Sequence, residues 1–198
     1  MNKLLSSSLA TFALLASANF AGATVITYNV VLSGPNESPA NASPGTGVGL
    51  VTIDDVLKTM RVQVSFSGLT GTTSNAHIHA ATAVPGVSTA GVATTTPSFA
   101  GFPLGVTAGT FDNTLDMTLA SSYNSSYITA NGGTPLSAFA ALETASNDGK
   151  AYFNIHTSTF GGGEIRGFLI ANPVPEPASL ALIGLGGCAL GMVRRRRN

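Results

Sequence analysis

The chain has 198 residues, of which 9% are charged, and its formal net charge is zero. Between Thr24 and Asn172 the sequence carries four basic and eight acidic residues, so this part has a net charge of −4 and no basic patch, which argues against nucleic acid as a partner. The single cysteine, Cys188, lies outside that part, which excludes a disulfide, a reactive thiol and a cysteine metal site within it.

The first residues have the three zones of a secretory signal peptide. Lys3 supplies a positive charge, Leu4–Ala18 is apolar and uncharged, and Ala21–Ala23 places small residues where signal peptidase reads them. A buried N-terminal helix is the alternative, but the stretch is uniformly apolar rather than amphipathic. We predict a signal peptide over residues 1–23, a signal helix cleaved after Ala23, with a cut after Ala18 as the second option.

The first half of the remaining sequence predicts strands. Residues 24–32 are rich in β-branched and aromatic side chains, and a loop with several prolines and glycines follows. Gly47–Ile53 predicts a second strand. Thr59–Phe66 alternates strictly between apolar and polar residues, which is typical of a half-buried strand. A fourth strand is expected over Ala76–Ala80.

The second half mixes irregular sequence with further strands and one helix. Residues 81–109 are rich in Thr, Pro and Gly, which predicts an irregular excursion or weak edge strands. Phe111–Leu119 predicts a return to strand. Pro135–Ser146 is the one good helix candidate, with Thr134 as its N-cap and an apolar face formed by Leu136, Phe139, Ala140 and Leu142.

Two more strands are expected near the end of this region. Lys150–Thr157 and Glu164–Ile170 flank a glycine-rich segment and predict a hairpin. Many short strands separated by turn signals favour an all-β domain over residues 24–172, built as an antiparallel β-sandwich of the immunoglobulin-like or superoxide-dismutase-like kind, with one short helix.

The C-terminal residues contain three features in order. Pro175, Glu176 and Pro177 precede an uncharged run over residues 178–193, and Arg194, Arg195, Arg196 and Arg197 follow it. The run predicts a membrane helix, although it is shorter than the roughly 20 apolar residues of a comfortable span. The arginines would stay on the cytoplasmic side, so that the domain faces outward. A plain single-pass anchor is one interpretation of this tail.

The tail, from Val174 to Arg197, resembles the PEP-CTERM sorting signal of Gram-negative bacteria. The resemblance implies that residues 173–198 are a sorting tail and that an exosortase in the inner membrane recognises Pro175, Glu176 and Pro177. It further implies release or transfer of the protein to the cell surface or to extracellular polymer. Signal peptidase, exosortase and the inner membrane are therefore the expected partners, and extracellular polysaccharide is a candidate partner.

The three histidines fall in two of the expected strands. His77 and His79 are two residues apart, so they share one face of a strand, and His156 lies on another strand together with Tyr152 and Asn154. Two imidazoles at this spacing and a third from a neighbouring strand suit Zn or Cu. We therefore consider a divalent-metal site formed by His77, His79, His156 and Glu164.

A polar network without metal is the alternative for the same residues. Neutral histidine both donates and accepts hydrogen bonds, so the histidines and Asn154 would hold strands together. Glu164 and Arg166 would then form an ion pair or cap the loop over residues 33–39. No cofactor is expected in that case.

Several motifs are similar to those of the CHRD domain, which was named from chordin. They are the His77–His79 pair, YFNIHT at Tyr152–Thr157, GEIRG at Gly163–Gly167, and SGPNESP at Ser33–Pro39, in which Glu37 holds the acidic position. Asn154 and Arg166 are further motif residues. The resemblance covers Tyr28–Leu169, apart from an insertion-like region over residues 81–130.

These features predict an exported, exosortase-sorted surface or extracellular-matrix protein. Its CHRD module would be structural or adhesive and not an enzyme. The alternative is a Cu- or Zn-binding module, or a metalloenzyme, that uses the histidine cluster.

Overall fold

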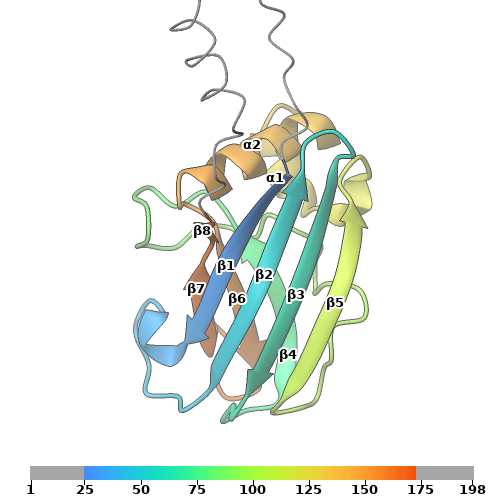
Figure 1. Cartoon of the computed structure of the whole chain (residues 1–198). Helices are drawn as coiled ribbons and strands as arrows, with labels where there is room; N and C mark the ends of the chain where they lie inside the picture. Colours follow the sequence, from blue (N-terminus) through green and yellow to red (C-terminus); the bar gives the residue numbers. More distant parts are fainter. Residues whose placement is uncertain (1–24, 173–198) are drawn as a thin grey trace, which may run out of the picture.

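The structure is a computed structural model that describes residues 25–172. These residues form eight strands, two 3-10 turns and two α-helices (Figure 1). The strands are β1 (Val25–Ser33), β2 (Thr46–Asp54), β3 (Thr59–Ser67), β4 (Thr73–His79), β5 (Gly109–Asp116), β6 (Tyr152–Thr157), β7 (Ile165–Phe168) and β8 (Ile170–Ala171). The helical segments are η1 (Gly34–Asn36), η2 (Ala120–Ser122), α1 (Ser125–Ala130) and α2 (Pro135–Asn147).

All eight strands belong to one antiparallel sheet with the order β4-β6-β7-β1-β2-β3-β5, and β8 also pairs with β1. The sheet curls, so that β1, β2, β3 and β5 lie in front of β4, β6 and β7 in Figure 1, with the helices at one end. The predicted all-β, antiparallel class is confirmed. The strands form one curled sheet, and the particular type of sandwich stays a prediction.

The strand predictions are confirmed with shifted ends. β3 buries Met60, Val62, Val64 and Phe66 and points the residues between them outward, as its alternation predicts. Strand β5 stops at Asp116 and does not continue to Leu119. The Asp116 carboxylate accepts hydrogen bonds from the backbone N–H and the hydroxyl of Thr118, which turns the chain there.

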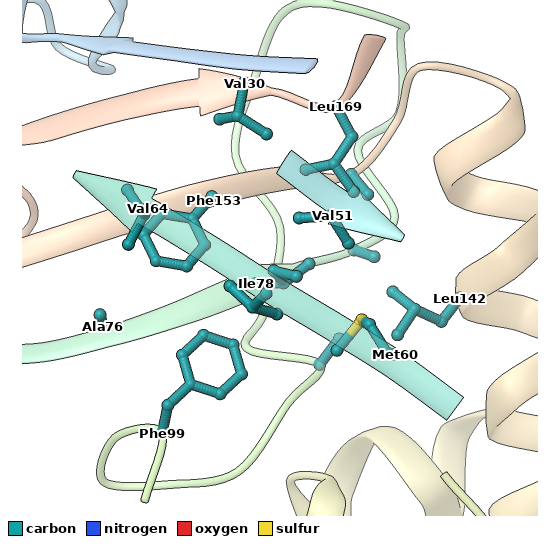
Figure 2. Close-up of a cluster of buried hydrophobic side chains, with 14 of the residues drawn as sticks. Val30, Val51, Met60, Val64, Ala76, Ile78, Phe99, Leu142, Phe153 and Leu169 are labelled. Carbon is teal, nitrogen blue, oxygen red and sulfur yellow. The ribbon is translucent and has the colours of Figure 1, made fainter. Parts of the chain in front are cut away.

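The concave side of the sheet holds the hydrophobic core. Phe153 of β6 stacks on Phe99 with ring centroids 5.8 Å apart, and Phe99 in turn stacks on Phe111 of β5. Figure 2 shows the rings of Phe99 and Phe153 beside Ile78, with Leu142 of α2 close to Met60 of β3. The core therefore joins the two halves of the curled sheet.

The predicted helix is confirmed as α2, but its apolar face is rotated from the predicted one. Leu136 is 55% exposed and Ala140 also faces outward, whereas Phe139 and Leu142 are buried. The buried set also includes Ala138, Ala145 and Ser146. Thr134 caps the helix by accepting a hydrogen bond from the Ser137 backbone N–H.

The segment between β4 and β5, residues 80–108, runs along the free edge of β4. Its backbone N–H groups donate to β4 carbonyls, from Ala93 to Ile78 at 2.9 Å and from Gly105 to Thr73 at 2.8 Å. The prediction of an irregular excursion is confirmed, and the excursion covers an edge that would otherwise expose unpaired backbone groups.

The predicted signal helix and the predicted membrane helix lie outside the described residues. Across residues 25–172, no helix is both long enough and apolar enough to cross a membrane.

The aromatic stack predicts a large loss of stability on truncation. Phe153→Ala should lower the free energy of unfolding by about 3–5 kcal/mol, because it leaves a cavity beside the Phe99 ring. Leu57→Ala, at a side chain that is 69% exposed, is the control and should change it little. Urea unfolding measures both, and equal losses would contradict this account of the core.

Candidate metal centre

Strands β4, β6 and β7 are buried on both faces. Their concave face carries apolar residues, whereas their convex face carries the polar residues of the sequence motifs. The strand register places His77 opposite Asn154, and Asn154 opposite Arg166, in one row across the three strands. The next row pairs His79 with Tyr152. The motifs therefore meet on one surface because residues two apart on a strand share a face.

Loops lie over this convex face. The β1–β2 loop brings Glu37, the β4–β5 excursion brings Ala90 and Pro97, and the β6–β7 turn brings Gly161 into contact with it. All three histidines are consequently less than 10% exposed. The polar layer is thus enclosed between a sheet and loops.

One ring nitrogen of each histidine is hydrogen-bonded to a loop carbonyl. The pairs are His77 Nε2 with the Pro97 oxygen at 2.5 Å, His79 Nδ1 with the Ala90 oxygen at 2.9 Å, and His156 Nδ1 with the Gly161 oxygen at 3.0 Å. A carbonyl oxygen can only accept, so each of these nitrogens carries the hydrogen. In the neutral ring, the other nitrogen is then an acceptor with a free lone pair.

The second ring nitrogen of each histidine has no partner. His77 Nδ1, His79 Nε2 and His156 Nε2 are all buried without a hydrogen-bond partner. Within the described residues, one ligand nitrogen from each of the three histidines lies within 4.8 Å of the others. Imidazole nitrogens without a hydrogen are metal ligands, so this group of three histidines can hold a metal ion.

Burial keeps the three imidazoles neutral. It lowers the pKa of His77 and of His156, and it lowers the pKa of His79 to about 4. Each imidazole would repel a charge on its neighbours, because the ring centroids of His77 and His156 are 5.2 Å apart. Neutral rings are the form in which histidine binds a metal.

Aromatic stacking fixes the orientation of one of the rings. His79 stacks on Tyr152 with ring centroids 4.7 Å apart and planes only 6° from parallel. The guanidinium of Arg166 lies over the other part of this stack, 4.8 Å from the Tyr152 ring centroid. The sequence placed Tyr152 on the histidine face but gave no sign of this stacking role.

Glu164 does not join the histidines. Its carboxylate is fully buried and accepts hydrogen bonds from the hydroxyls of Ser43 and Thr157 and from the backbone N–H groups of Thr70 and Gly71. Burial raises its pKa, but these four donors outweigh burial and place the pKa below its ordinary value. Glu164 therefore ties loops to the sheet and has no free oxygen lone pair directed at the metal site.

Arg166 does not pair with Glu164 but with the β1–β2 loop. Its Nε lies 3.9 Å from Glu37 Oε2 and donates to the Asn36 carbonyl, and its Nη1 donates to the Ser88 carbonyl at 3.0 Å. Of the two residues expected to pair or to cap the loop over residues 33–39, Arg166 contacts that loop, whereas the Glu164 carboxylate binds Ser43, Thr70, Gly71 and Thr157. Burial raises the pKa of Glu37 to about 7, although Arg166 opposes this shift.

At both glycine positions of the GEIRG motif a larger residue would clash with its neighbours. Gly163 has φ +132°, and a Cβ there would lie 2.6 Å from the Asn154 amide and 2.7 Å from Glu37 Oε1. A Cβ on Gly167 would overlap the Val31 carbonyl of β1. The two buried charged residues, Glu164 and Arg166, therefore lie between two positions where only glycine leaves room for the neighbouring atoms.

A family model described as the CHRD domain matches residues 28–169, which is more than half of the chain, and the chain belongs to the CHRD family. A second model, described as the PEP-CTERM protein-sorting motif, matches residues 173–197. Both resemblances found in the sequence are thereby confirmed. No curated protein and no solved structure matches the chain.

The sorting motif implies export across the inner membrane to the cell envelope or surface of a Gram-negative bacterium, with processing by an exosortase. The residues that carry this motif lie outside the described part of the chain, as does the predicted cleavage site after Ala23. They are Pro175, Glu176, Pro177 and Arg194, Arg195, Arg196 and Arg197.

The role of Glu164 predicts a pH-dependent loss of stability in Glu164→Gln. At neutral pH the variant should lose about 3 kcal/mol, because its NH2 group faces the two donors that one carboxylate oxygen accepts from in the wild type. Ionised Glu164 stabilises the fold above its unfolded pKa near 4.5, and this contribution disappears as the pH falls through the lower folded pKa. The difference from the wild type should therefore narrow in acid.

Urea unfolding at several pH values measures this difference. Glu143→Gln on α2 is the matched control, because Glu143 is only half-buried, and it should differ little from the wild type at any pH. Equal stability of Glu164→Gln and the wild type at neutral pH would show that the four hydrogen bonds do not hold the loops.

Proposed function

We propose that the CHRD domain of this exported protein is a metal-binding module in which His77, His79 and His156 hold Zn²⁺ or a copper ion. One observation carries the proposal: each histidine keeps a buried ring nitrogen without a partner, and one ring nitrogen from each lies within 4.8 Å of the others. Zinc–nitrogen bonds of about 2.0–2.1 Å require ligand nitrogens about 3.3 Å apart. Ring shifts of roughly 0.9 Å or less would bring nitrogens up to 4.8 Å apart to that spacing.

The chemistry of the donors supports zinc or copper over calcium or magnesium. Imidazole nitrogen suits zinc and copper, whereas calcium and magnesium prefer oxygen ligands. In each histidine, the ring nitrogen that would not bind the metal donates its hydrogen to a backbone carbonyl. Metal-bound histidines usually have such a bond, because it fixes the tautomer and the ring orientation.

The metal would fasten the β4–β5 excursion and the β6–β7 turn to the sheet. Each histidine already holds a loop carbonyl, so fixing the rings would also fix Ala90, Pro97 and Gly161. Burial of all three rings supports a structural rather than an enzymatic role. A metalloenzyme is the second candidate. Three histidines leave one position of a tetrahedral metal ion open for water or substrate, as in catalytic zinc sites, and this favours it.

The wider role that we propose is structural or adhesive, at the cell surface or in the extracellular matrix. The CHRD match and the sorting motif together support an exosortase-sorted extracellular protein. A metal-fastened domain without cysteines would be stabilised outside the cell without a disulfide. Extracellular polysaccharide is the partner that we propose for this role.

Metal content is the direct test. The domain over residues 24–172 should bind one Zn²⁺ or copper ion, measured by mass spectrometry of metals after gel filtration. His77→Gln and His156→Asn should reduce binding at least about tenfold, because each keeps a donor for its loop carbonyl and loses the ligand nitrogen. Ser74→Ala, at an exposed residue of the same strand as His77, is the matched control and should bind normally.

Absence of stoichiometric metal at neutral pH would refute the metal module. Metal that raises the melting temperature without supporting any reaction would support the structural role. Catalysis that requires the metal, and that is lost in His77→Gln, would instead support the metalloenzyme.

Processing of the tail is a separate prediction. Mass spectrometry of the mature protein should find a C-terminus near Pro175 and an N-terminus at Thr24. A mature protein that still carries Arg194–Arg197 would contradict exosortase processing and support a permanent anchor.

A further inference from the structure

The turn between β2 and β3 exposes two neighbouring apolar side chains, Val56 and Leu57, which form an apolar tip. Val56 is 62% exposed and Leu57 is 69% exposed. Val25, which lies opposite Asp54 at the same end of the sheet, is 48% exposed. Single exposed apolar residues are common on proteins, but a group of them at one end of a fold indicates a surface that contacts something apolar.

The backbone N–H groups of the apolar tip already have partners. The Asp54 carboxylate accepts hydrogen bonds from the N–H of Val56 at 2.9 Å and from the N–H of Leu57 at 2.8 Å. The carbonyl of the next residue, Lys58, accepts from the Met117 N–H at 2.8 Å. Unpaired backbone groups strongly oppose the transfer of a loop into an apolar medium. These hydrogen bonds therefore lower the cost of covering the tip.

Both ends of the described chain lie at the same end of the sheet as the apolar tip. Figure 1 shows the β2–β3 turn, helix α2 and the start of β1 there. Asn172, the last described residue, donates its backbone N–H to the Thr27 carbonyl at 2.9 Å, and Thr27 pairs with Thr52 of β2. Because a strand rises about 3.3 Å per residue, the tip lies at least about 7 Å further along the hairpin than Asn172.

The length of chain beyond Asn172 limits how far this end can be from a membrane. The uncharged run over residues 178–193, which predicts a membrane helix, begins six residues after Asn172. Six residues span at most about 20 Å. While that run is in the membrane, the end of the domain that carries the apolar tip must therefore stay within about 20 Å of the bilayer.

We propose that the apolar tip docks on the outer surface of the inner membrane, against neutral lipids, for as long as the C-terminal tail anchors the chain. Val56 and Leu57 would enter the boundary between headgroups and acyl chains, where apolar side chains of peripheral proteins bind. In the turn, Asp54 and Asp55 outnumber Lys58, so anionic lipid does not attract it. The docking is therefore apolar in origin and insensitive to salt.

The tail is what makes such a small contact effective. Two apolar side chains hold a separate protein on a membrane only weakly, but a short tether raises the effective concentration of the contact to the order of mM. Removal of the tail would therefore release the domain. This inference rests on the predicted membrane helix and on the proposed processing of the tail, and it does not depend on the metal.

Tryptophan fluorescence tests the docking, because the chain contains no tryptophan. Leu57→Trp places one reporter in the apolar tip. Leu104→Trp is the matched control, at a side chain that is 52% exposed. Leu104 lies shortly before β5, which begins opposite Phe66 at the end of β3 that is far from the turn.

The full-length variants are reconstituted into phosphatidylcholine vesicles whose acyl chains carry bromine near the headgroups, since bromine quenches tryptophan on contact. Compared with unbrominated vesicles, the fluorescence of Leu57→Trp should fall at least about twofold, at low and at high salt, and that of Leu104→Trp should change little. Val56→Trp is a second reporter in the tip and should behave as Leu57→Trp does.

Equal quenching of Leu57→Trp and Leu104→Trp, or no quenching in either tip variant, would overturn the docking. A blue shift of the tip emission without quenching would also overturn it, because protein and not lipid would then cover the tip. Flotation of the vesicles is measured in parallel. A chain that floats with the vesicles while its tip is not quenched overturns the docking and leaves the membrane helix standing, whereas a chain that does not float removes both.

Discussion

The outer face of β4, β6 and β7 is polar but lies under loops, and every polar group there must find a partner inside the protein. A polar group that is buried without a partner costs about 1–3 kcal/mol, so this layer controls which loop conformations are stable. Glu164 meets the requirement with four donors from loops and strands. Arg166 meets it with two loop carbonyls and Glu37. The loops are thus held by the charges that they cover.

Each histidine meets this requirement with only one of its two ring nitrogens. Each satisfies a loop carbonyl and retains one nitrogen that can only accept. The five buried side-chain atoms without partners in residues 25–172 are all acceptors and all come from this layer; they are Glu37 Oε1, His77 Nδ1, His79 Nε2, Asn154 Oδ1 and His156 Nε2. A bound cation relieves an excess of acceptors, and one ring nitrogen from each of the three histidines lies within 4.8 Å of the others. The other two, on Glu37 and Asn154, lie beside Gly163.

Much of this arrangement was predictable from local pattern. The alternation in β3 fixed which side chains enter the core, and the spacing of His77 and His79 placed them on one face. The partners of the histidines were not predictable, because the carbonyls of Ala90, Pro97 and Gly161 are backbone atoms with no signature in the sequence. Glu164 looked like a fourth ligand because its four donors come from residues up to 121 positions away. The buried face of α2 was misjudged at Leu136, because the sheet and not the helix decides which face is covered.

Nitrogen-15 NMR of the histidine side chains tests the central claim most directly, because it reports the tautomer of each ring and the nitrogen that binds the metal. The account predicts that the metal-free domain has hydrogens on His77 Nε2, His79 Nδ1 and His156 Nδ1, and that one equivalent of zinc shifts His77 Nδ1, His79 Nε2 and His156 Nε2. Zinc that leaves these three nitrogens unshifted, or rings that carry their hydrogens on the inward nitrogens, would contradict the metal centre.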